Sequence, residues 1–185
     1  MSWTIDGTLD PDEALRLLDH MSGASNNDFA MLIENKGSVV EGESARQYED
    51  GKQRMDIAGY AYLAEVVTPP GASKGKVRNH SLIVVRNCDA ATASIASLMK
   101  NQDSDIKVEL SVFKAGGDSS KDMQPTLEIV LEGARIDTHS ILTGGSPRRP
   151  CEILFFRYRK IEIRSASQKG TGQRGAVRSC VMNAD

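Results

Sequence analysis

The sequence predicts a mainly β protein, a small antiparallel β-barrel with a flanking α-helix, an extended loop and an N-terminal helical extension. Three observations predict this fold. Six or seven apolar runs of strand length follow one another at short spacing, several alternate apolar with polar residues, and only one helical pattern interrupts them. Parallel βαβ units would place a helix after every strand, so antiparallel pairing is favoured.

The N-terminal extension has the pattern of a helix that begins at Asp10. Asp10-Pro11-Asp12-Glu13 combines an N-cap aspartate, a proline at the first helical position and a glutamate three residues after the cap. The helix is predicted to run to about Met21. Its narrow apolar stripe consists of Ala14, Leu17, Leu18 and Met21. The stripe indicates that this helix docks on something, in the first instance the main domain.

Strands are predicted over residues 29–33, 57–67, 77–86, 105–113, 127–136 and 151–163, and a second helix, capped by Asp89, over 87–100. Pro69-Pro70-Gly71 ends the second of these strands because proline cannot donate to a ladder. In the last strand the apolar residues change parity between Tyr158 and Ile161. That strand therefore either bulges near Arg159-Lys160 or is covered on both faces.

Residues 41–56, called the polar loop below, contain almost no apolar residue. Hairpin connections usually take about 2–5 residues, so a connection of this length needs another explanation. The loop is predicted to be either a flexible lid or an arm that packs on another molecule.

Composition describes a globular domain with an uneven charge distribution. The chain has 185 residues, 39% of them hydrophobic, with a net charge of −2, which excludes a long disordered polymer and a membrane span. Residues 1–147 hold 14 basic and 22 acidic residues, whereas residues 148–185 hold 9 basic and 3 acidic ones. This asymmetry is compatible with a nucleic-acid tail, a pore lining or complementarity between subunits.

The first residues lack the basic start and apolar run of a signal peptide, so we expect synthesis and folding in the cytoplasm. Cys88, Cys151 and Cys180 are odd in number and have no C-x-x-C spacing, which argues against disulfides and a zinc site. Cys88 and Cys151 border apolar runs and are expected in the core. No catalytic, metal-binding or cofactor-binding residue is predicted.

Several short motifs have a plainer structural explanation. Residues 71–75 match G-x-S-x-G around Ser73, but they lead into a strand and not a helix, which favours a solvated hairpin loop. Residues 170–175 match G-x-G-x-x-G without a preceding strand, which favours a flexible tail or loop. Asp103 and Asp105 are expected to cap a turn, and the sequon at Asn79 needs an export route that this chain does not show.

Three segments, in order and at the right spacing, resemble one family. They are residues 29–34 with Asp56-Ile57-Ala58-Gly59-Tyr60-Ala61-Tyr62, residues 76–86 followed by 89–95, and Phe155-Phe156-Arg157-Tyr158-Arg159-Lys160-Ile161-Glu162. Together they resemble the haemolysin-coregulated protein family, the inner-tube protein of type VI secretion. The resemblance covers roughly residues 28–163. It suggests three parts: a helical extension (1–27), the barrel domain (28–165) and a Gly-rich basic tail (166–185).

The resemblance implies a subunit that forms six-membered rings, which stack into a hollow tube expelled by a contractile sheath. The implied partners are other copies of the chain, sheath and spike proteins, and effectors in the lumen, with no nucleic acid and no membrane insertion. Secretion would follow cytoplasmic assembly without a signal peptide. The polar loop would be an intersubunit arm with the contact residues Glu41, Glu43, Arg46, Tyr48, Glu49, Asp50, Lys52 and Arg54. The basic residues expected at an intersubunit contact or in the lumen would be Arg157, Arg159, Lys160 and Arg164.

The resulting hypothesis is a structural and carrier protein that is not an enzyme. The alternative is a binding module whose basic C-terminal part holds nucleic acid or another anionic surface.

Overall fold

A computed structural model describes residues 27–46, 48–114, 124–144, 147–168 and 174–184, so the helix expected at 10–21 lies outside the described residues. The strands are β1 (Asn27–Asn35), β2 (Ser38–Val39), β3 (Met55–Asp56), β4 (Gly59–Ala61), β5 (Ala64–Val67), β6 (Lys76–Asn79), β7 (Leu82–Asn87), β8 (Ile106–Lys114), β9 (Leu127–Gly144), β10 (Arg149–Arg157), β11 (Lys160–Gln168) and β12 (Arg174–Asn183), and the helix is α2 (Ala91–Lys100). The mainly β, antiparallel fold class is confirmed.

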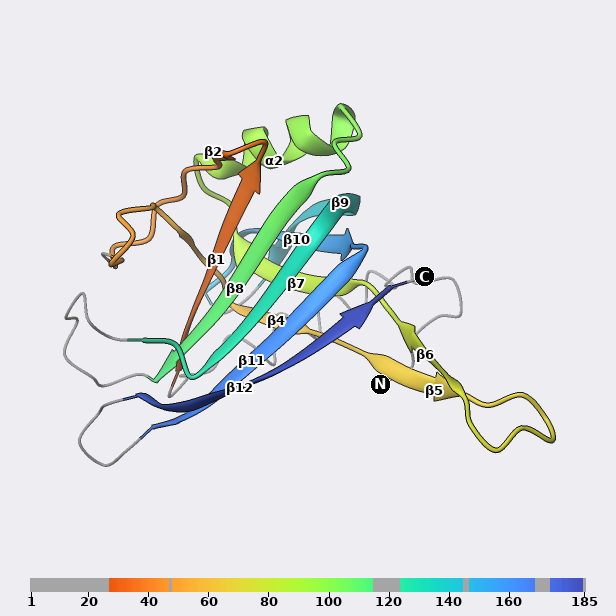
Figure 1. The fold of residues 1–185 in the computed structure, drawn as a ribbon. Coiled ribbons are helices and arrows are strands. Elements are labelled where there is room, and N and C mark those ends of the chain that lie inside the picture. Colours follow the sequence, from red (N-terminus) through yellow and green to blue (C-terminus); the bar gives the residue numbers. More distant parts are fainter. Residues whose placement is uncertain (1–26, 47, 115–123, 145–146, 169–173, 185) are drawn as a thin grey trace.

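The strands form two layers that share β9 (Figure 1). The first half of β9 pairs with β8 and β11, and its second half pairs with β10. The layers are therefore β1-β8-β9-β11-β12 and β9-β10-β7-β4. β9 changes direction near Gly133, which has φ +59° and lies so close to Arg159 that a Cβ would come within 2.5 Å of its Nε.

The ladder is not closed by continuous strand pairing, but the short segment at residues 55–61 links its two edges. β3 pairs with β1, and β4 pairs with β7. Between them the Ile57 amide donates to the Phe29 carbonyl (3.1 Å) and the Ala58 amide to the Val85 carbonyl (2.8 Å). One bent segment thus serves two strands that lie on opposite sides of the core.

The main core fills the space between the layers. It includes Met31 and Ile33 of β1, Leu110 of β8 and Leu154 and Phe156 of β10, all fully buried. α2 closes one end and contributes three buried side chains, Ala91, Ile95 and Leu98. The helix has Ala90 at its N-cap position, one residue after the expected Asp89, whose Oδ1 accepts the Ala91 amide at 2.8 Å.

The differences from the sequence analysis concern breaks and an added strand. The predicted strands at 57–67 and 77–86 are each interrupted, the first into β4 and β5 and the second into β6 and β7. The predicted strand at 151–163 is two strands, β10 and β11, separated by Tyr158 and Arg159, and this break explains the change in parity. The tail expected beyond residue 165 instead continues β11 and adds β12, which pairs with β11 from Lys160↔Asn183 to Gln168↔Arg174. None of the helices in the described part of the chain is long and apolar enough to cross a membrane.

Candidate functional site

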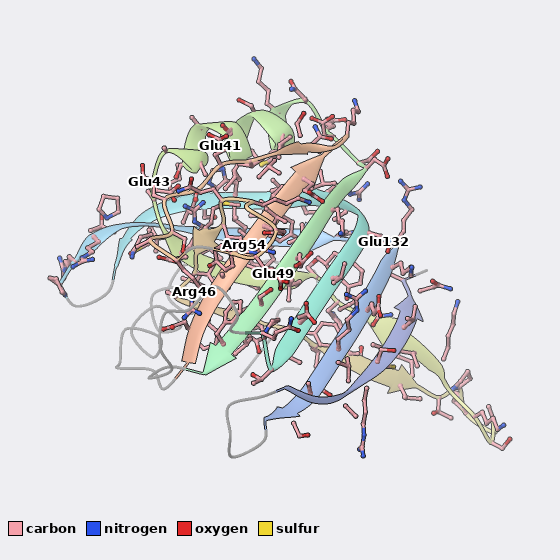
Figure 2. All side chains as sticks on the ribbon, turned by 60° about the vertical axis from the view of Figure 1, so that its left-hand side comes forward. Glu41, Glu43, Arg46, Glu49, Arg54 and Glu132 are labelled. Atoms are coloured by element: carbon pink, nitrogen blue, oxygen red, sulfur yellow. The ribbon has the colours of Figure 1, made fainter. Side chains whose placement is uncertain are left out.

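The polar loop folds back on the first sheet layer of its own subunit. Gly42 is buried against β3, where a Cβ would come within 2.6 Å of the Arg54 carbonyl, and the Ser44 amide donates to that carbonyl at 3.1 Å. The loop is thereby held in two adjacent runs. Figure 2 shows Arg46, Glu49 and Arg54 in front of β1 and β8, whereas Glu41 and Glu43 lie beside α2.

Arg54 is the centre of the docked loop, with only 6% of its surface exposed. Its guanidinium donates to both carboxylate oxygens of Asp50, at 2.8 and 3.0 Å, and to Glu109 Oε1 of β8 at 3.3 Å. This hydrogen bonding lowers the pKa of the Asp50 carboxyl. A buried guanidinium is tolerated here because two carboxylates bind its terminal nitrogens, although its Nε has no hydrogen-bond partner among the described residues.

Aromatic stacking adds a second set of contacts between the loop and β8. The Arg54 guanidinium lies 4.3 Å from the Tyr48 ring centroid, and that of Arg46 lies 4.6 Å from the Phe113 centroid. The Tyr48 and Phe113 rings pack against each other at 6.0 Å. Burial raises the pKa of the Tyr48 hydroxyl. Cations and rings therefore alternate along the contact.

The remaining loop residues divide by charge. Lys52 pairs with Glu34 and Arg46 pairs with Asp28, so these basic side chains hold acids of β1. Glu41, Glu43 and Glu49 are exposed, and the Glu43 carboxylate also accepts the Ala90 amide near the start of α2. Of the eight predicted arm residues, the basic ones thus make contacts within the subunit, and the acidic residues of the loop face solvent to different extents.

The β5–β6 hairpin (Ala64–Asn79) forms a separate two-stranded sheet and projects away from the two layers (Figure 1). All residues of β5 and all but the last of β6 are exposed. Val66 pairs with Val77 on one face, and their exposed fractions are 64% and 45%. Isolated two-stranded ribbons are marginally stable in water, so this ribbon is suited to packing on another surface.

The root of this hairpin is fixed to the body. The Tyr158 hydroxyl donates to the His80 carbonyl, and the Tyr62 hydroxyl donates to Asn79 Oδ1, both at 2.9 Å. Burial raises the pKa of Tyr158, whose ring lies in the main core. These two hydrogen bonds therefore hold the base of the hairpin rigidly, so that the hairpin projects in a defined direction.

The four predicted basic positions of the C-terminal part all contact carboxylates. Arg157 pairs with Asp137, Arg159 with Asp105 at 3.5 Å and Lys160 with Glu132 at 2.9 Å. Arg164 donates to both oxygens of Glu162, at 2.8 and 2.7 Å, and thereby lowers the pKa of that carboxyl. Local neutralisation of this kind weakens the alternative of an anion-binding surface.

The short motifs that the structure describes lie in connections between elements, whereas most of the motif at 170–175 lies outside the described residues. Ser73 is exposed in the loop between β5 and β6, as the sequence predicts for a solvated hairpin loop. Asp103 and Asp105 lie between α2 and β8 and pair with Lys36 and Arg159. Cys151 is buried as expected, whereas Cys88 is half-buried. Among residues that the structure describes, no group of three metal-ligating side chains comes together.

A buried ionic cluster joins α2 to the second layer. Arg86 and Glu152 are both completely buried, and their side chains pair at 3.1 Å. Arg86 also pairs with Asp89, and Glu152 accepts from Thr92 (3.2 Å) and lies 2.6 Å from His139 Nε2. The cluster fixes the start of α2 against β7, β9 and β10, which is a structural role.

The described part of the chain defines a structural class: small, two-layered antiparallel β proteins with a flanking helix and a projecting hairpin. The family model described as type VI secretion system effector, Hcp, matches residues 31–164. The chain therefore belongs to the Hcp family of type VI secretion proteins.

Solved structures of type VI secretion proteins share the fold. A type six secretion system protein is 23% identical with a TM-score of 0.63, covering 81% of this chain and 91% of its own. Hcp1 from Salmonella typhimurium is 14% identical with a TM-score of 0.62, covering 84% and 95%. A type VI secretion system effector from Yersinia pestis is 21% identical with a TM-score of 0.56, covering 83% and 99%. No curated protein sequence matches the chain significantly.

Proposed function

We propose that this chain is a structural tube subunit of a type VI secretion system. Copies form six-membered rings, rings stack into a hollow tube, and a contractile sheath expels the tube with effectors in its lumen. The sheath, the spike at the tip and the effectors are the proposed partners. Cytoplasmic assembly is followed by release of folded protein, and the chain has no catalytic role.

One observation carries the self-association: the β5–β6 hairpin presents Val66, Val67 and Val77 to solvent from a rigid root. Apolar side chains gathered on a projecting ribbon indicate a protein contact. The hairpin lies on one side of the subunit, so its receptor on a second copy is a different surface, and such a heterologous contact closes into a ring when the rotation permits.

The polar loop contributes to the same proposal through its acidic side. Glu41, Glu43 and Glu49 are exposed on the loop, while its basic residues contact the subunit to which they belong. We place these three carboxylates in contacts with a neighbouring copy. There they would affect the rate and specificity of association more than its affinity.

Light scattering of the purified protein during size exclusion tests this function. A mass close to six times the 20.1 kDa chain mass is expected, together with rings and short tubes in negative-stain images. A species of one or two chain masses at the concentrations used for imaging, with no rings visible, would contradict it.

A further inference from the structure

The second sheet layer has an apolar face that points away from the main core. Ile83 and Val85 of β7 and Cys151, Ile153 and Phe155 of β10 form a separate cluster there. Their exposed fractions are 4% or less. We call the surface formed by these five residues the outer face. Both faces of β7 and β10 are thus buried, although a sheet exposed on one side would alternate apolar with polar residues.

The partly buried apolar residues that pack against the outer face, among those that the structure describes, do not cover it. They are Ala58, Ala61 and Leu142. Ala61 pairs with Ile83, Leu142 pairs with Cys151, and the Ala58 amide donates to the Val85 carbonyl, so all three lie in the same layer as the cluster. α2 packs on the main core instead. Side chains that stand out from a sheet are buried only by groups above it, so the outer face requires a cover.

We propose that this cover is the amphipathic helix predicted at residues 10–21 of the same chain. The first argument is where the chain enters the fold. β1 begins at Asn27, and the Phe29 ring meets that of Tyr60 in β4 at 6.0 Å. Since β4 is the strand that borders β7, the start of β1 lies near the edge strand of the second layer, and residues 22–26 lead to that start. Five residues reach about 17 Å, enough to cross several strands at about 4.8 Å each.

The second argument is the match of length and pattern. A helix of the predicted length is about 18 Å long, and the six residues of β7 extend over about 20 Å. The stripe of Ala14, Leu17, Leu18 and Met21 supplies an apolar surface of the width that one helix needs. The sequence therefore offers an apolar stripe of the length and width that a cover for the outer face requires.

The third argument is charge. Residues 1–26 contain five acidic side chains and one basic side chain. The row of β10 that carries Cys151, Ile153 and Phe155 ends at exposed Arg149 on one side and, on the other, at Arg157, which already pairs with Asp137. An acidic helix laid along an apolar face with the basic side chain of Arg149 at one end is electrostatically favoured.

The proposal has a consequence for assembly. The family model begins at residue 31, so the segment is an addition to the shared domain. If it covers the outer face, neighbouring copies contact other surfaces, among them the β5–β6 hairpin.

Cysteine labelling tests the proposal because the chain has a reporter on the outer face and another elsewhere. Cys151 lies in the outer face, and Cys180 is exposed on β12. The full chain is treated with iodoacetamide, and peptide mass spectrometry gives the labelling rates of both thiols. Cys180 is expected to react and Cys151 to be protected. In Leu17→Asp/Leu18→Asp the ratio of Cys151 to Cys180 labelling is expected to rise about tenfold or more, because a charged stripe cannot stay on an apolar face.

The matched control is Arg16→Gln/Asp19→Asn, which alters the opposite side of the predicted helix without changing net charge and is expected to keep Cys151 protected. Hydrogen exchange in β8, which lies in the other layer, verifies that the domain stays folded, and Leu18→Ala serves as a milder variant if it does not. Continued protection of Cys151 in both stripe variants would overturn the proposal. So would loss of protection when the unchanged protein is diluted to monomer, because the cover would then be a second copy.

Discussion

The polar loop and the β5–β6 hairpin are both long polar connections between strands, yet the loop is docked on its own sheet and the hairpin projects into solvent. The loop carries basic residues that each find an acid on β1 or β8 or within the loop, and Arg54 is buried with two of them. The hairpin carries valines without a surface beneath them. The polarity and length of a connection therefore do not show whether it is an assembly arm. Whether the connection docks on its own subunit depends on the partners that its side chains find on the neighbouring sheet.

The largest expected effect is a loss of assembly when the β5–β6 hairpin, and not the polar loop, is changed. Val66→Asp/Val77→Asp places two charges on the apolar face of the hairpin and is expected to shift the protein from ring mass to single-chain mass in light scattering. The thermal unfolding midpoint of the chain should change little, because both side chains are already exposed. Glu65→Gln/Arg78→Gln, on the other face of the hairpin, is the control that should keep the ring. Retention of the ring by the valine variant would remove the hairpin from the interface.

The next effect concerns stability. Arg54→Ala leaves Glu109 and Asp50 without their guanidinium and is expected to lower the free energy of unfolding by about 2–3 kcal/mol, less than for a fully buried pair because Asp50 is 40% exposed. Urea denaturation measures it. Arg46→Ala, whose partner Asp28 is 55% exposed, is the comparison and should cost clearly less. Equal losses would show that burial of Arg54 contributes nothing specific.

A smaller effect depends on pH. Because Arg54 holds the pKa of Asp50 below its ordinary value of 3.8, the ionised form favours the folded state. This stability is present above about pH 4 and is lost as the pH falls through the lowered pKa. The difference in unfolding free energy between the protein and Asp50→Asn should therefore be constant at neutral pH and shrink in acid. A difference that grows in acid would reverse the assigned sign. Glu49→Gln, at an exposed position in the same loop, is the control.

The smallest effect tests the acidic side of the polar loop. Glu41→Lys/Glu43→Lys is expected to weaken assembly by about three- to tenfold in the dissociation constant, with little change in the unfolding midpoint, because exposed charges contribute little to a fold. Light scattering over a dilution series measures the first quantity and calorimetry the second. Parallel losses of assembly and unfolding midpoint would place these charges in the fold and not in the contact.

The sequence was sufficient where local pattern determines structure. Alternation of Ile106, Val108 and Leu110 predicted β8, and the Asp89 cap predicted the start of α2 within a few residues. The solvated hairpin loop around Ser73 followed from its proline and glycine neighbours. The apolar residues change parity between Tyr158 and Ile161, and this change indicated an irregularity where β10 ends and β11 begins. The sequence left open whether a bulge or coverage of both faces caused it.

The sequence was insufficient where partners are far apart in the chain. Arg54 and Glu109 are 55 residues apart, so nothing local marks their pairing or the docking of the polar loop. β12 was missed because it follows a glycine-rich segment, although Val177 and Val181 recur with strand parity. The exposure of Val66 and Val77 could not be predicted from the sequence either. A short run of alternating apolar and polar residues has the same pattern in a core strand and in a free ribbon.

The pairing of β1 with β8 also constrains the order of folding. Ala30 of β1 lies opposite Ser111 of β8, and the chain between them contains the polar loop, the hairpin and α2. During synthesis β1 can meet only β2 and β3 until β8 has left the ribosome, and contacts of such sequence separation form slowly. The apolar run Phe29-Ala30-Met31-Leu32-Ile33 stays open to wrong partners for that interval. Correct folding of the first layer thus depends on the time that β8 takes to leave the ribosome.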